Sequence, residues 1–99
     1  MLFALHAIDR TDVPGLRAAT RPEHLVYLQG FGVKIVLAGP LLAFDGTTPI
    51  GSLVVFDARD RVEAEAMVAG DPYSKAGLFA TVMISPLRVG IQNLPVAAP

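Results

Sequence analysis

The chemistry open to this 99-residue chain is narrow, because it contains no cysteine and only two histidines, His6 and His24. The absence of cysteine excludes a catalytic thiol, a disulfide framework and thiolate metal ligands. The chain also lacks glycine-rich phosphate loops, the Gly-x-Ser-x-Gly nucleophile motif and the His-x-x-x-His spacing of metal ligands. We therefore expect no metal and no cofactor, and acid/base chemistry by histidine and carboxylate is what remains.

His24 is the first candidate for that chemistry. It stands at helical spacing with Leu28 and Phe31, which turns its imidazole toward the sheet side of a helix. The same spacing also fits a partly buried histidine bonded to a backbone carbonyl. Arg21, one turn earlier, and Arg17 could each orient an anion or form a surface ion pair.

Asp71 is the candidate partner for His24. It stands directly before Pro72, which is typical of a capping residue at the start of a helix. If its carboxylate also faces His24, it would fix the tautomer of the ring and prepare it to take a proton from a substrate. Tyr73 could close the pocket or simply pack in the core. His6, in an apolar run, fits a packing residue better than a catalyst.

The composition indicates one folded domain. The chain is 53% apolar and 17% charged, with 8 basic and 9 acidic residues and a net charge of −1. It is too apolar for disorder and lacks the clustered basic residues that bind nucleic acid. The apolar segment 1–8 is too short to span a membrane and has no basic residues before it. We expect a soluble, cytoplasmic protein that binds neither nucleic acid nor membrane.

Turn-forming residues separate the elements that must position these side chains. Short apolar runs are typical of strands, and apolar residues at helical spacing are typical of helices. In chain order we predict a strand over 2–8, a helix over 14–30, strands over 33–43 and 51–57, a helix over 59–69, a short helical turn over 72–77 and a strand over 78–89.

Three local signals refine these elements. Asp12, two residues before a proline, is expected to cap the first helix. Because proline cannot donate to a strand ladder, Gly39-Pro40 places the second strand at a sheet edge or beside a bulge. Asp45-Gly46 predicts the turn between the second and third strands.

The order βαββαβ predicts an α+β, ferredoxin-like fold, with both helices on one face of a four-stranded antiparallel sheet. Residues 1–89 would form the domain and 90–99 a C-terminal tail. Both alternating sets of the third and last strands are largely apolar, so the other sheet face would be hydrophobic. We expect a second copy to cover it and enclose a pocket, with polar groups from Ser52, Thr81 and Ser85.

Four short motifs lie, in chain order, on the first helix, on the second strand, at the start of the third strand and before the last strand. They are Thr20-Arg21-Pro22-Glu23-His24-Leu25, Ala38-Gly39-Pro40-Leu41, Gly51-Ser52, and Asp71-Pro72-Tyr73 with Ala76-Gly77-Leu78. Together, over residues 1–89, they resemble the YciI-like (YCII-related domain) family. The resemblance implies a ferredoxin-like fold that pairs into a dimeric α/β barrel. It also implies an enzyme whose acid/base pair falls on His24 and Asp71. One branch of the family is associated with dehydrochlorination of chlorinated aromatics, which is proton abstraction with loss of a leaving group.

The leading hypothesis is a homodimeric enzyme that transfers a proton on a small, cyclic or carbonyl-bearing molecule, in the manner of a dehydrochlorinase or other lyase, or of an isomerase. His24 would be the base or acid and Asp71 would orient it, with Arg21, Ser52 and Tyr73 in contact with the substrate. One alternative is a non-catalytic small-ligand-binding or accessory module. Another is an oligomeric structural protein in which the pair is a polar core contact.

Overall fold

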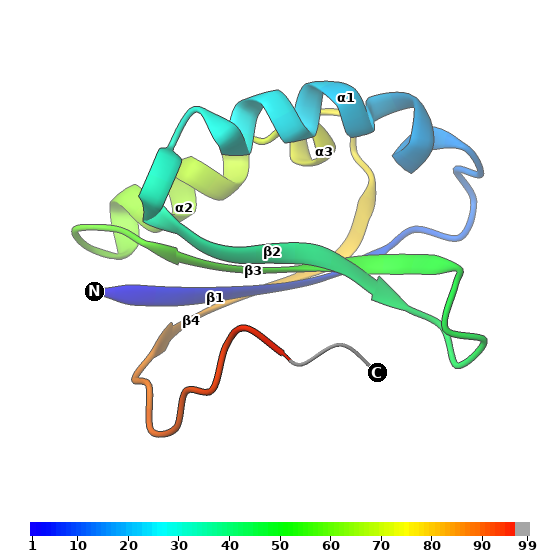
Figure 1. Cartoon of the computed structure of the whole chain (residues 1–99). Coiled ribbons are helices and arrows are strands. Elements are labelled where there is room, and N and C mark those ends of the chain that lie inside the picture. The colour runs from blue at the N-terminus through cyan, green and yellow to red at the C-terminus, as the bar shows by residue number, and fades with distance from the viewer. Residues whose placement is uncertain (97–99) are drawn as a thin grey trace.

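A four-stranded antiparallel sheet carries all the helices on one face (Figure 1). The computed structural model describes residues 1–96. The strands lie in the order β2-β3-β1-β4 and comprise β1 (Leu2–Asp9), β2 (Ile35–Leu42), β3 (Pro49–Asp57) and β4 (Phe79–Leu87). The helices are α1 (Leu16–Gln29), α2 (Arg61–Gly70) and α3 (Pro72–Lys75), with a 3₁₀ turn over Gly32–Lys34. The predicted ferredoxin-like order βαββαβ is confirmed, with α3 as a short addition.

The core lies between the sheet and the helices. Alternate residues of β1, namely Phe3, Leu5 and Ala7, are buried on the helix side. Phe56 and Val54 of β3 stand opposite Phe3 and Leu5 and are buried with them. In this register the helix-facing side chains of β1 and β3 form the apolar surface on which the helices pack.

The first helix begins later than predicted. Asp12 does not cap it, because its carboxylate accepts hydrogen bonds from the side chain of Arg10. The residue before the helix is Gly15, whose φ of 81° is the left-handed conformation that glycine adopts at low cost. That turn separates Asp12 from the helix and starts α1 at Leu16.

The second strand is an edge strand, as Gly39-Pro40 predicted, and its register shifts lie elsewhere, at Ile35/Leu37 and Leu41/Leu42. Val33 and Lys34, predicted as its start, form the 3₁₀ turn instead.

The Asp45 turn is confirmed. Its carboxylate accepts hydrogen bonds from the amides of Thr47 and Thr48 and from the Thr48 hydroxyl. These bonds, above all the one from the Thr48 hydroxyl, lower the pKa of Asp45 to about 2.

The sheet face opposite the helices holds Thr81 and Ser85, as predicted, but not Ser52. Thr81 and Ser85 pair with Ile8 and Ala4, which alternate with the buried residues of β1. Ser52 instead pairs with Ala7, and both are buried on the helix side. The prediction for Ser52 was wrong because both alternating sets of β3 are mostly apolar and carry no inside-outside signal.

The end of the chain follows β4. It turns back on the side of the sheet away from the helices (Figure 1). Of the predicted tail 90–99, residues 97–99 lie outside the described part of the chain. Within residues 1–96, no helix is long and apolar enough to cross a membrane.

Candidate active site

His24 of α1 and Asp71, which precedes α3, are in direct contact although 47 positions apart. The Nδ1 atom of His24 lies 2.8 Å from Oδ2 and 2.9 Å from Oδ1 of Asp71, and both side chains are buried. An ionised carboxylate can only accept hydrogen bonds, so Nδ1 carries the proton of the neutral ring. This leaves Nε2 as the basic nitrogen.

The Asp71 carboxylate has a second task at the start of α3. Its Oδ1 accepts the backbone amide of Tyr73 at 2.9 Å, and Pro72 opens the helix. Capping and contact with His24 are therefore not alternatives for Asp71, because one carboxylate does both. The cap holds the carboxylate in place for the histidine.

Tyr73 packs directly against the imidazole of His24. The two ring centroids lie 3.9 Å apart and the planes differ by 15°. On Tyr73 also lies the guanidinium of Arg17, with its Cζ atom 4.7 Å from the ring centroid. Burial raises the pKa of the Tyr73 hydroxyl, and the Arg17 charge acts against this rise. Tyr73 is thus a buried, neutral aromatic that fixes the plane of the histidine.

Arg17 forms an ion pair below the surface, so the predicted alternative of a surface pair was wrong for it. Its Nε and one terminal nitrogen bind the Asp9 carboxylate at 2.7 and 2.8 Å, and the two side chains are only 14% and 13% exposed. The same terminal nitrogen donates to the Ser52 hydroxyl at 2.8 Å. Burial lowers the pKa of Arg17, but the hydrogen bonds and charge of Asp9 outweigh it and leave the pKa raised.

Asp9 is the residue of this network that the sequence reasoning missed. It ends β1 and was assigned to the polar stretch that closes the strand. One signal could have found it: Asp9 continues the alternating set of Phe3, Leu5 and Ala7, and so points to the helix side.

A cavity of about 370 Å³ opens beside these side chains, between α1 and strands β2 and β3. Its polar wall consists of Arg17, Arg21, His24, Ser52 and Tyr73, and the rest is mostly apolar or glycine. This volume lies in the range of small-molecule sites. The wall contains no carboxylate, so its formal charge is positive.

Arg21 is the exposed cation of that wall. The structure gives it no ion pair with any of residues 1–96, so the expected surface pair is not formed there. It is therefore available to an anion in the cavity.

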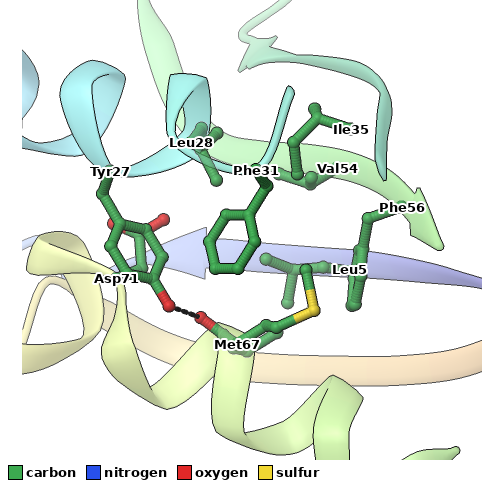
Figure 2. A pocket seen from close by; sticks show the side chains of 10 residues that line it. Leu5, Tyr27, Leu28, Phe31, Ile35, Val54, Phe56, Met67 and Asp71 are labelled. Atoms are coloured by element: carbon green, nitrogen blue, oxygen red, sulfur yellow. Dashed lines mark hydrogen bonds between the residues drawn. The ribbon is translucent and has the colours of Figure 1, made fainter. Parts of the chain in front are cut away.

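A second, much smaller cavity lies on the other side of Asp71 (Figure 2). Its volume is about 20 Å³ and its wall is apolar, with Leu5, Phe31 and Phe56 pointing into it. Beside it the Tyr27 hydroxyl donates to the Met67 carbonyl at 2.7 Å. Burial raises the pKa of Tyr27, and the charge of Asp71 adds to the rise. This small apolar cavity is too small to hold a substrate and carries no part of the proposed chemistry.

His6 takes no part in the site. It pairs across the sheet with Leu53 and Met83, on the face away from the helices, where it is exposed. Within residues 1–96, no three His, Cys, Asp or Glu side chains gather as metal ligands.

Comparison with known proteins identifies the family of this chain. The YCII-related domain family matches residues 1–88. Protein YciI of Escherichia coli O6:H1 is 32% identical over 95 residues, which cover 89% of this chain and 97% of that protein. The chain belongs to the YCII-related domain family.

The same comparison holds for structure. The YCII-related chain superposes with a TM-score of 0.82 and 31% identity on the dehydrochlorinase TftG of Burkholderia phenoliruptrix AC1100. The match covers 91% of this chain and 96% of TftG. TftG is a 5-chloro-2-hydroxyhydroquinone dehydrochlorinase, and its structure is a complex with 2,5-dihydroxybenzoquinone.

A comparison of two capping aspartates, Asp60 and Asp71, measures what the His24–Asp71 contact contributes to stability. Asp60 caps α2 by accepting the Glu63 amide at 2.9 Å, as Asp71 caps α3, but Asp60 binds no histidine. We expect Asp60→Ala to cost about 1 kcal/mol of unfolding free energy. Asp71→Ala should cost about 2–4 kcal/mol, because a buried histidine also loses its partner. Denaturant unfolding measures both, and equal losses would contradict the contact.

Proposed function

We propose that this chain is an acid/base enzyme that transfers a proton on a small ring or carbonyl compound, with His24 as the base or acid. The observation that carries the proposal is the buried His24–Asp71 pair, in which Asp71 binds Nδ1 and His24 lines the 370 Å³ cavity. The kinship with TftG supports a dehydrochlorinase-like or isomerase-like reaction. The substrate class we propose is a hydroxylated ring that can enolise.

The proposed reaction begins with the substrate C–H bond. Nε2 of His24 takes the proton, and the electron pair of that bond moves onto the ring and its oxygen. Asp71 stabilises the imidazolium that forms. In a dehydrochlorination the electrons then expel chloride, whereas in an isomerisation His24 returns the proton to another carbon. Arg21 and the Ser52 hydroxyl would meet the charge that develops on the oxygen.

We also propose that the active form is a homodimer, closed as an α/β barrel. The sheet face away from the helices exposes apolar side chains, including Met83 at 64% and Leu87 at 40%. An exposed sheet face with this many apolar side chains is unusual for a monomer, and a second copy of the same face is its simplest cover.

Substitution of His24 tests the catalytic proposal. The assay follows chloride release from 5-chloro-2-hydroxyhydroquinone, and deuterium uptake from heavy water by a panel of hydroxylated rings. We expect His24→Ala to lower turnover by about 10²-fold or more. Val26→Ala, at an exposed residue of α1 on the helix side of the molecule, is the control and should leave turnover unchanged.

Two outcomes would contradict this proposal. One is equal turnover by the wild type and a folded His24→Ala variant. The other is a wild type that binds panel compounds and converts none of them, which would make the chain a small-ligand-binding module.

Sedimentation at micromolar concentration tests the dimer. We expect the wild type to sediment as a dimer and Met83→Lys to dissociate it, because a buried ammonium would need a partner. Val26→Lys is the matched control, since Val26 is 70% exposed on α1, on the helix side of the molecule. A monomeric wild type would refute the proposal.

A further inference from the structure

We infer that Asp9 and Arg17 are positioning residues that hold the Ser52 hydroxyl as a hydrogen-bond donor to an oxyanion in the cavity. The inference rests on the proposed function, because it assigns a role to the wall of the same cavity. Neither Asp9 nor Arg17 has to react with the substrate for this role. They act through Ser52.

The guanidinium of Arg17 is fully oriented by Asp9. Two parallel hydrogen bonds of 2.7 and 2.8 Å join Nε and one terminal nitrogen to the two carboxylate oxygens. Such paired bonds fix the plane of a guanidinium as well as its position. The remaining hydrogen of that terminal nitrogen then has one direction, and Ser52 Oγ lies along it at 2.8 Å.

This contact decides the polarity of the Ser52 hydroxyl. A guanidinium has donors and no acceptor, so the serine oxygen must accept. The hydrogen of the hydroxyl is left without a bond, and no side chain or carbonyl of residues 1–96 accepts it. Ser52 is buried but belongs to the wall of the large cavity. A molecule in that cavity is therefore the natural acceptor.

The backbone at Ser52 is held as firmly as its side chain. A Cβ on the preceding residue, Gly51, would lie 2.2 Å from the Ala7 carbonyl oxygen, so β3 approaches β1 closely here. Ser52 itself pairs with Ala7 across these strands. Ser52 is thus held at its backbone by the pairing of β3 with β1 and at its hydroxyl by the Arg17–Asp9 ion pair.

The chemistry that such a donor serves is stabilisation of negative oxygen. A hydroxyl that accepts from a cation is polarised and becomes a stronger donor. Fixed donors lower the energy of a charge that develops during reaction without any reorganisation. Asp9 also neutralises Arg17, so the guanidinium orients Ser52 and does not itself attract the anion away from Arg21 and His24.

A double-mutant cycle on ligand affinity tests the inference. The probe is 2,5-dihydroxybenzoquinone, the compound bound by TftG, titrated by calorimetry into the purified protein. We expect Ser52→Ala to weaken binding by about tenfold or more. Asp9→Asn should weaken it as well, because Arg17 loses its orientation. In the Ser52→Ala background, Asp9→Asn should cause no further loss of affinity, because the hydroxyl through which Asp9 and Arg17 act is already gone.

Two more variants keep the test decisive. Arg17→Lys retains the charge but loses the guanidinium that bridges Asp9 and Ser52, so we expect it to lower the affinity for the probe as Asp9→Asn does. It can take the place of Asp9→Asn if that variant fails to fold. Asp12→Asn removes the carboxylate of the exposed Arg10–Asp12 pair and should leave affinity unchanged.

The inference is overturned by any of three results. These are full affinity in Ser52→Ala, an undiminished effect of Asp9→Asn or Arg17→Lys without the Ser52 hydroxyl, and no binding of the probe by the wild type at millimolar concentration. The cycle measures affinity and not turnover, so a failure of this inference can be distinguished from a failure of the proposed function. A Ser52 effect that persists in His24→Ala would stand even if His24 proved not to be catalytic.

Discussion

The buried carboxylate of Asp71 is the group on which the rest of the site depends. A carboxylate away from water is costly unless every oxygen has a partner. Asp71 meets this demand with the Tyr73 amide on one side and His24 Nδ1 on the other. It thereby joins the start of α3 to the middle of α1, and the ring of Tyr73 follows into contact with the imidazole. The short helix exists in this place because the carboxylate serves both elements.

A second carboxylate, Asp9, repeats the arrangement across the Tyr73 ring. Asp71 binds His24 and Asp9 binds Arg17. In both pairs the nitrogen-bearing side chain lines the cavity, and the aspartate is not among the lining residues. The wall consequently presents donors and a basic nitrogen, and no acidic oxygen. An anion is the ligand that such a wall attracts, which is the charge that proton abstraction creates on a ring oxygen.

The sequence carried more of the fold than of the site. Periodicity was enough for the order of strands and helices, and for the inward direction of His24. A proline after Asp71 was enough for the cap. The contact between them could not come from local pattern, because it joins positions 47 apart and depends on how α3 packs beside α1. Its prediction rested on topology and on family resemblance.

The errors have equally local causes. Ser52 was placed on the wrong face because its neighbours on both sides of β3 are apolar, so alternation gave no direction. Asp9 was assigned to the polar stretch that closes a strand, and Arg17 was left open between an anion contact and a surface ion pair, because an ion pair between distant elements leaves no trace in spacing. The start of α1 was misplaced because Asp12 and Pro14 are typical of a helix start, whereas Gly15 takes a left-handed conformation and the helix begins after it.

The most direct test of the central claim is the position of the proton on the His24 ring. Nitrogen-15 NMR of the imidazole distinguishes the two neutral tautomers through the shifts of Nδ1 and Nε2. With the Asp71 carboxylate beside Nδ1, the neutral ring should carry its proton on Nδ1 and leave Nε2 unprotonated toward the cavity. A proton found on Nε2 would contradict the account, because His24 could then not take a proton from a substrate at that atom.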